Sequence, residues 1–188
     1  MSNKKDLNFE TKVIHAGQKS DPTTGAVMTP IVLASTFEQS SPGVHKGYDY
    51  SRSINPTREA FENCIASLEN GVKGYGFSSG VAAISACIEL LSPGDHVIAM
   101  DDLYGGSVRL FNEIKTISQG IEVSYVDMTN VDNIKADLKE NTKMIFVETP
   151  TNPLLKVADL SKIARLAKAN KILTVCDNTF ASPFNQQP

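Results

Sequence analysis

Four short polar segments of the chain carry side chains suited to binding a small ligand. Each follows a mainly apolar run, and they are Ser78-Ser79-Gly80, Asp101 to Gly106, Glu148 to Pro153 and Asp177-Asn178-Thr179. They supply carboxylates, hydroxyls, amides and one aromatic ring. In an open parallel sheet, ligands bind beyond the carboxyl ends of the strands. If the apolar runs are parallel strands, these segments meet at one edge and form a ligand site.

The segment Ser78-Ser79-Gly80 marks a change from an apolar run to a helical pattern. Free backbone N–H groups at a helix start suit a phosphate, and Gly80 permits its close approach. A serine N-cap without any ligand is the simpler alternative. The glycines at 74, 76 and 80 miss the G-x-G-x-x-G dinucleotide pattern by one residue, and no phosphate-binding G-x-x-x-x-G-K-[ST] motif occurs.

Three further residues are candidates for ligand contacts. Asp177 ends a strongly apolar run, where a carboxylate is costly to bury unless it meets a cation or donors, such as a protonated ring nitrogen. Tyr104 stands beside two glycines that leave room for its ring to lie flat on a ligand, although on its own such a tyrosine more often serves packing. Asn152, between two prolines, indicates a positioned amide. We interpret Asp101 and Asp102 as turn and cap residues rather than as an acid/base pair.

The remaining pattern predicts the elements that position these residues. Short apolar runs predict strands at 75–77, 96–100, 121–126, 143–148 and 172–176. Helical periods predict helices at 80–91, 107–118, 131–139 and 159–169. This alternation is typical of a parallel α/β sheet covered by helices on both faces. Residues 1–55 read as an irregular arm, after which Asn55-Pro56 predicts a helix start and Asn70-Gly71 its end.

Composition excludes several other classes of protein. Of 188 residues, 41% are hydrophobic and 21% charged, which is ordinary for a globular chain. The formal charge of −3 offers no positive field for nucleic acid, and no apolar run is long enough to span a membrane. The polar N-terminus lacks the apolar core of a secretory signal. The three cysteines are far apart in the sequence, which indicates a reducing, cytoplasmic location, and we interpret them as small residues of the core. The three histidines show no metal-ligand spacing.

Taken together, these motifs resemble the trans-sulfuration group of pyridoxal-phosphate enzymes, the cystathionine γ-lyase and γ-synthase family. The similarity runs from Thr11 to Pro183 and includes the Tyr48–Arg58 stretch as well as the four polar segments. The resemblance implies an α/β, fold type I (aspartate aminotransferase-like) large domain that is incomplete here and has an irregular N-terminal arm. It implies an arm at 1–58 that reaches a neighbouring subunit and a partial cofactor domain at 59–188.

The resemblance also assigns roles in binding pyridoxal 5'-phosphate. Tyr50 and Arg52 resemble a Tyr-x-Arg pair that holds the phosphate of the neighbouring subunit, for which an arginine fork is suited. Gly80 and Val81 resemble the backbone donors to the phosphate. Tyr104 resembles the tyrosine stacked on the cofactor ring, which can also take part in proton transfer.

The remaining assignments concern the ring and the substrate. Asp177 resembles the carboxylate that holds the ring nitrogen, and Thr179 its neighbour beside the ring. Asn152 resembles the amide that contacts the cofactor hydroxyl and the substrate carboxylate. The implied activity is elimination at Cγ of cystathionine or a related sulfur amino acid, as in cystathionine γ-lyase. γ-Synthase and β-lyase are the alternatives.

One departure from the family is large. Its enzymes form a Schiff base to a lysine in a Ser-x-Thr-Lys motif beyond Asp-Asn-Thr, and no such motif follows Asp177 in this chain. We therefore expect the chain to be an N-terminal portion that is inactive alone. The alternatives are a non-catalytic remnant, one half of a split enzyme, or an unrelated α/β nucleotide binder. A full-length form is expected to be a homo-oligomer, a tetramer built from dimers, without nucleic-acid or membrane partners.

Overall fold

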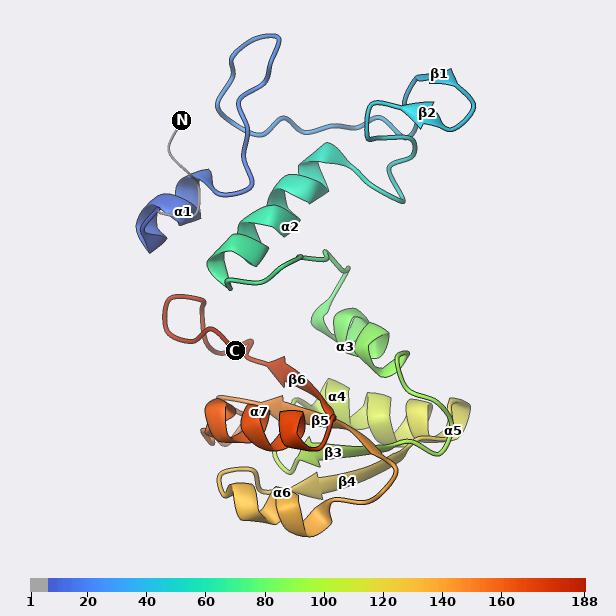
Figure 1. Cartoon of the computed structure of the whole chain (residues 1–188), viewed down its shortest axis with the longest axis vertical. Helices are drawn as coiled ribbons and strands as arrows, with labels where there is room; N and C mark the ends of the chain where they lie inside the picture. Colours follow the sequence, from blue (N-terminus) through green and yellow to red (C-terminus); the bar gives the residue numbers. More distant parts are fainter. Residues whose placement is uncertain (1–6) are drawn as a thin grey trace. The chain divides into compact units, whose positions relative to one another are not determined.

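A computed structural model describes residues 7–188 of the chain (Figure 1). The chain divides into two compact units. The first comprises Met1–Gly76 with Gln187, and the second comprises Phe77–Gln186 with Pro188. The predicted absence of a secretory signal rests mainly on residues 1–6, which lie outside the described residues.

The second unit contains a four-stranded parallel sheet. Its strands are β3 (His96–Met100), β4 (Glu122–Val126), β5 (Thr142–Glu148) and β6 (Leu173–Asp177), in the order β4-β3-β5-β6. The central strands β3 and β5 are buried along nearly their whole length, as expected for apolar runs covered on both faces. Four of the five predicted strands are thereby confirmed.

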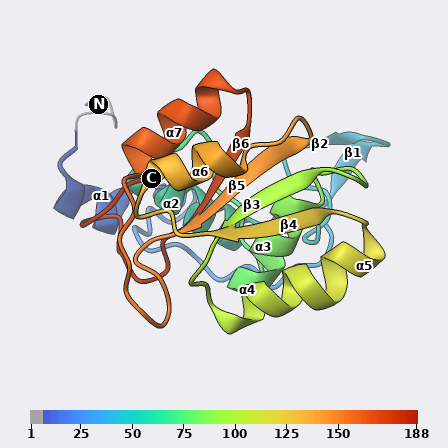
Figure 2. The same ribbon diagram turned by 90° about the horizontal axis from the view of Figure 1, so that it is seen from below.

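Helices cover both faces of this sheet. They are α3 (Gly80–Ile88), α4 (Gly105–Arg109), α5 (Thr116–Ser118), α6 (Val131–Asp137) and α7 (Leu160–Ala169). A π-helical segment, η2 (Leu110–Lys115), joins α4 to α5. Figures 1 and 2 show α6 and α7 on one face and α3, α4 and α5 on the other. The sequence predicted each of these helical regions, with ends that differ by a few residues, but gave no sign of the π-helical turns.

The helix starts are fixed by side-chain caps. The Ser79 hydroxyl accepts a hydrogen bond from the Ala82 amide at the start of α3, and the Asp159 carboxylate accepts one from the Lys162 amide at the start of α7. Such caps replace the intrahelical partners that the first amides lack. Phe111 of η2 and Phe146 of β5 then lock helix to sheet, with ring centroids 5.1 Å apart in an edge-to-face contact.

The first unit has more regular structure than the sequence indicated. It contains α1 (Phe9–His15), α2 (Pro56–Leu68) and a short hairpin of β1 (Gln39–Ser41) and β2 (Val44–His45). The prediction of a wholly irregular stretch before residue 56 was therefore wrong, because the Asn8 side chain caps α1 and the turn at Gly43 closes the hairpin. The predicted start of α2 is confirmed: Asn55 accepts a hydrogen bond from the Thr57 amide, and Pro56 takes the first helical position.

The strand predicted at residues 75–77 is also wrong. The segment forms no ladder with another strand in the described part of the chain. Gly76 lies instead beside α2, where its amide donates a hydrogen bond of 2.8 Å to Oε1 of Glu62. A Cβ on Gly74 would lie 2.1 Å from the Glu62 carbonyl oxygen, so the glycine permits a close approach to the helix.

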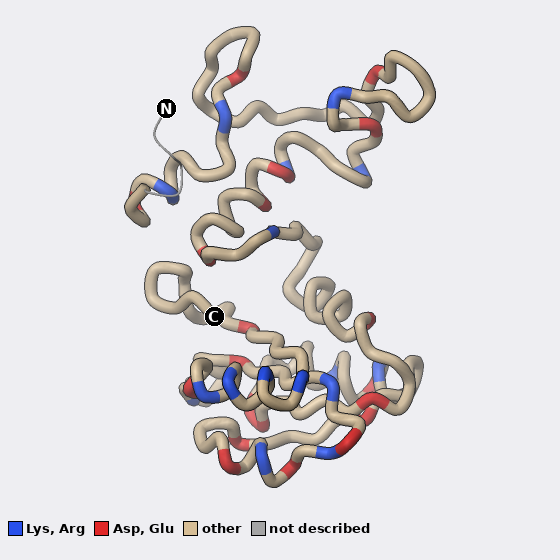
Figure 3. The backbone as a smooth tube through the Cα atoms, in the orientation of Figure 1, with Lys and Arg blue, Asp and Glu red and all other residues tan. Residues whose placement is uncertain are grey.

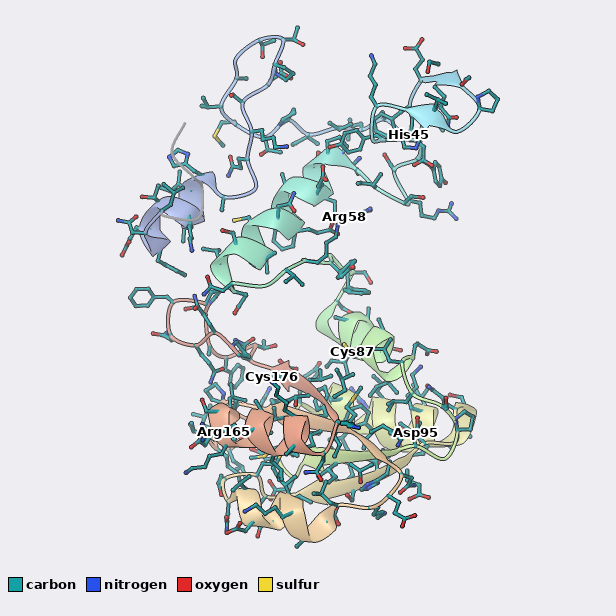
Figure 4. All side chains as sticks on the ribbon, viewed as in Figure 1. His45, Arg58, Cys87, Asp95, Arg165 and Cys176 are labelled. Carbon is teal, nitrogen blue, oxygen red and sulfur yellow. The ribbon has the colours of Figure 1, made fainter. Side chains whose placement is uncertain are left out.

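Charges of both signs are interspersed over the second unit (Figure 3). No helix among residues 7–188 is both long and apolar enough to cross a membrane. Cys64, Cys87 and Cys176 form no disulfide and are of intermediate burial. Cys176 packs against the hydrophobic core, as the sequence predicted, whereas Cys64 and Cys87 are not among the core residues. Figure 4 shows Cys87 on α3 and Cys176 on β6. In the described chain, no three His, Cys, Asp or Glu side chains are grouped to hold a metal ion.

Candidate active site

A cavity of about 170 Å³ lies at the carboxyl edge of the parallel sheet, within the second unit. It is lined by Gly80, Val81, Ile84, Tyr104, Glu148, Pro150, Asn152, Asp177, Thr179 and Phe180. Six of the eight residues predicted to bind the cofactor therefore meet in one place. Its volume is below the range of about 300–1,000 Å³ typical of sites for drug-sized ligands, so it suits a small molecule.

The start of α3 forms one wall of this cavity. The first amides of a helix have no intrahelical acceptor, and Ser79 occupies only that of Ala82. The amides of Gly80 and Val81 therefore remain available for an anion, with the helix dipole in support. Nothing lies within 4 Å of the position that a Cβ on Gly80 would take, so a ligand can approach the backbone. Phosphate binding fits this geometry.

Asp177 lies at the end of β6, directly beside Glu148 at the end of β5. Its Oδ1 accepts hydrogen bonds from the Thr179 amide at 3.0 Å and from the Thr179 hydroxyl at 2.6 Å. These bonds fix the orientation of the carboxylate. Oδ2 has no hydrogen-bond partner within residues 7–188, which leaves one oxygen to accept a proton donor such as a ring N–H.

Two loops carry the other polar groups. Tyr104 is the N-cap residue of α4, and its side chain is 47% exposed, so the ring is free to contact a ligand. Asn152 is held through its backbone N–H, which donates a hydrogen bond of 2.7 Å to Oε1 of Glu148. The Asn152 loop is further fixed by Asp102, which accepts hydrogen bonds from the Thr151 hydroxyl and the Leu154 amide. Asp102 thus anchors a loop about 50 residues further along the chain, and the prediction that it is a turn or cap residue was wrong.

Sequence reasoning gave no role to four residues of the cavity, namely Ile84, Glu148, Pro150 and Phe180. Glu148 was placed at the sheet edge but without a task, although a carboxylate at the end of a buried apolar strand was a visible signal. It is 4% exposed, and this burial raises its pKa. The negative charges of Asp177 and Asp102 raise it further, whereas hydrogen bonds from the Tyr104 and Asn152 amides lower it.

Tyr50 and Arg52 lie in the first unit. A guanidinium nitrogen of Arg52 donates a hydrogen bond of 2.8 Å to the Tyr50 hydroxyl, and the guanidinium carbon lies 5.3 Å from the centre of the Tyr50 ring. The pair therefore forms a single cationic group, and its role toward a phosphate stays a prediction.

Comparison with known proteins identifies the family of the chain. Residues 10–188 match the family model described as Cys/Met metabolism PLP-dependent enzyme. The chain belongs to this family. Pyridoxal phosphate is accordingly the expected cofactor of this chain. The groups that line the cavity fit this cofactor, because they include backbone donors for its phosphate, a carboxylate for its ring nitrogen and an aromatic ring that can stack on it. The family resemblance predicted from the motifs is confirmed.

Three relatives show the range of activities in the Cys/Met metabolism family. A cystathionine β-lyase from Coxiella burnetii is 55% identical, covering all of this chain and 48% of the relative. A probable cystathionine γ-synthase from Herpetosiphon aurantiacus is 46% identical, covering 97% of this chain and 57% of the relative. The crystal structure of cystathionine γ-lyase from Lactobacillus plantarum complexed with L-serine superposes with a TM-score of 0.93 at 46% identity, covering 97% of this chain and 47% of that one.

The chain thus spans about half the length of the relatives that it matches. The structural likeness confirms the prediction of a partial fold type I domain, because this chain of a PLP-dependent family, with its parallel α/β sheet, superposes on about half of the cystathionine γ-lyase structure.

Proposed function

We propose that the protein containing this chain is a pyridoxal-phosphate-dependent lyase that cleaves a carbon–sulfur bond of cystathionine or a similar amino acid. The observation that supports this most directly is the convergence of α3, Tyr104, Asn152 and Asp177 on one small cavity. The family match and the names of the relatives agree with it.

Each residue of the cavity has a defined task in this proposal. The Gly80 and Val81 amides bind the phosphate, and the Tyr104 ring stacks on the ring of the cofactor. Oδ2 of Asp177 accepts the hydrogen bond of the ring nitrogen and keeps that nitrogen protonated, while Thr179 holds the carboxylate in place. The Asn152 side chain orients the cofactor hydroxyl and the substrate carboxylate. When bound, the cofactor supplies an electron-accepting ring that stabilises negative charge at Cα of the amino acid.

The position of the cleaved bond distinguishes two activities. Cleavage of the Cβ–S bond of cystathionine, with loss of the Cα proton and uptake of water, yields homocysteine, pyruvate and ammonia. Cleavage of the Cγ–S bond yields cysteine, 2-oxobutanoate and ammonia. The motifs alone favoured γ-cleavage, but the relative with 55% identity is named a β-lyase, whereas the γ-lyase structure is 46% identical. We therefore propose β-cleavage as the main activity, with γ-cleavage as the second candidate.

The first unit has an assembly role in this proposal. Tyr50 and Arg52 extend to the cofactor phosphate of a neighbouring subunit, so the full protein is a homo-oligomer built from dimers. The cation of Arg52, braced by the Tyr50 hydroxyl, suits a phosphate oxygen pair. The proposed location is the cytoplasm, where thiols such as those of Cys64, Cys87 and Cys176, which form no disulfide, stay reduced.

The 188 residues alone are proposed to lack elimination activity. No lysine is among the residues that line the described cavity, so the chain itself does not provide an amine to hold the cofactor covalently. If the chain were one half of a split enzyme, a second polypeptide would have to supply that lysine. Release of pyruvate or 2-oxobutanoate by the pure 188-residue chain would contradict the proposal.

The proposal is tested on the protein as its source makes it. Borohydride reduction followed by intact-mass measurement should show a chain about twice as long as this one that carries one reduced cofactor, in line with the coverage of the relatives. Incubation with cystathionine should release pyruvate in excess of 2-oxobutanoate. A protein that binds no pyridoxal phosphate, or that cleaves neither bond, contradicts the proposed function.

A further inference from the structure

Glu148 is a buried carboxylate that the cofactor contacts proposed above leave without a task. It lies at the end of β5, and each of its oxygens accepts a hydrogen bond from a different loop. Oε2 accepts from the Tyr104 amide at 2.9 Å, and Oε1 accepts from the Asn152 amide at 2.7 Å. Tyr104 and Asn152, whose backbone amides are held in this way, belong to different loops and both line the cavity.

The electrostatic surroundings of Glu148 do not favour a carboxylate for stability alone. Burial raises its pKa, and Asp177 and Asp102 add negative charge nearby. Only the two amide donors act in the other direction. A buried charge with like charges around it costs free energy that an apolar side chain of the same size would not cost. What the carboxylate does provide is two acceptor oxygens in a rigid plane.

We propose that Glu148 is a positioning residue that, by holding both backbone amides, fixes the Tyr104 ring and the Asn152 side chain relative to each other at the cavity. The proposal rests on the proposed function, since it assigns the positioned groups to cofactor and substrate. Glutamine in the same place has one acceptor oxygen, and its NH₂ group would face an amide N–H. The substitution therefore releases one of the two loops while it conserves the shape of the side chain.

The test uses the complete cofactor-loaded protein with the substitution Glu148→Gln. Because the ionised carboxylate is disfavoured by burial, the neutral variant is expected to fold and to retain its cofactor. The KM for cystathionine should rise about tenfold or more, the effect of losing a hydrogen bond to a charged group. The induced circular dichroism of the bound cofactor should also weaken, because the ring above it is less ordered. Glu140→Gln, at an exposed position, is the matched control and should change neither value.

A second measurement needs no variant and no cofactor. In the cofactor-free protein, the Tyr104 and Asn152 amides should exchange their hydrogens at least about tenfold more slowly than the Gly105 and Gly106 amides, which lie in the first turn of α4 and have no intrahelical acceptor. This measurement tests whether Glu148 holds the two backbone amides even if the protein proves not to bind pyridoxal phosphate.

Either of two results overturns the inference. One is a Glu148→Gln protein whose KM and circular dichroism equal those of the unmodified protein. The other is exchange of the Tyr104 and Asn152 amides at the rate of the neighbouring glycines. Failure of the proposed function has a different signature, since the unmodified protein would then lack bound cofactor while the slow exchange of the two amides persists.

Discussion

The ring of Tyr104 lies over Gly106. A Cβ placed on Gly106 would stand 2.4 Å from Cε1 of Tyr104 and 3.0 Å from its Cδ1, closer than any unstrained contact. The tyrosine ring therefore occupies its place at the cavity only because the residue two positions later has no side chain. The predicted space beside the ring is confirmed, and its source is Gly106 rather than Gly105, where an added Cβ would have nothing within 4 Å.

The substitution Gly106→Ala should separate cofactor binding from stability. The clash involves the outer part of a mobile side chain, so the ring moves and the fold persists, while alanine favours the helix by up to about 1 kcal/mol. Loss of stacking should weaken cofactor affinity up to about tenfold. Titration of the cofactor-free protein with pyridoxal phosphate measures this change. Gly105→Ala is the control, and equal affinities of the two variants would show that the ring does not stack.

Asp177→Asn should lower activity more than it lowers stability. The asparagine side chain retains an oxygen for the Thr179 amide and hydroxyl but no longer carries the charge that keeps a ring nitrogen protonated. A hydrogen bond to a charged group contributes about 1.5–3 kcal/mol, which corresponds to a loss of at least about tenfold in kcat. Steady-state kinetics and a shift in the cofactor absorption band measure the effect. Unchanged kcat would remove Asp177 from the proposed site.

Mixing two variants of low activity should show whether Arg52 serves the cavity of a neighbouring subunit. Arg52→Ala removes the proposed phosphate cation, and Asp177→Asn impairs the ring contact. If the two residues of one site come from different chains, random dimers of the variants contain some intact sites. About a quarter of the unmodified activity should then return on co-expression.

The same experiment has a clear negative result. If Arg52 acts on the cavity of its own chain, no mixed dimer contains an intact site, and activity stays at the level of the separate variants. Arg165→Ala, on α7 (Figure 4), controls for the general loss of a positive charge and should leave the activity unchanged.

A hydrogen-bonded chain at the other end of the sheet makes stability depend on pH. Nδ1 of the buried His96 lies 2.9 Å from the Thr142 hydroxyl, and Nε2 lies 2.9 Å from the Ser124 hydroxyl. The Thr142 hydroxyl accepts a hydrogen bond from the Lys139 amide and can donate its proton to Nδ1, whereas the Ser124 hydroxyl donates its proton to Asp137 and can accept one from Nε2. These bonds are consistent with a neutral His96 ring that carries its proton on Nε2. Burial, followed by the charge of Lys139, lowers the pKa of His96.

A histidine with a lowered pKa in the folded state binds fewer protons there than in the unfolded chain. The stability that it contributes is therefore complete above the unfolded pKa of about 6.5 and declines as the pH falls toward and through the folded pKa. Urea unfolding of the complete protein between pH 7.5 and 5 should show this decline. His96→Gln should reduce the slope, and identical slopes for the two proteins would contradict the assignment.

Periodicity and residue type predicted most of the second unit. Apolar runs such as Met144–Val147 can be buried only inside a covered sheet, and polar residues at their carboxyl ends must then share one edge. From this argument Tyr104, Asn152 and Asp177 are expected at one edge of the sheet, and the cavity confirms their proximity.

The sequence by itself thus determined the α/β class, the edge that carries the site and the family. Only the tertiary structure decided that Gly76 contacts Glu62 of α2 and that residues 75–77 do not join the sheet, because three residues are too few for their pattern to predict what they pack against. Only the structure gave Glu148 its two amide donors from separate loops, and Gly106 its place beneath the Tyr104 ring. These are contacts between positions that local pattern does not connect, and they depend on how the loops fold back over the strand ends.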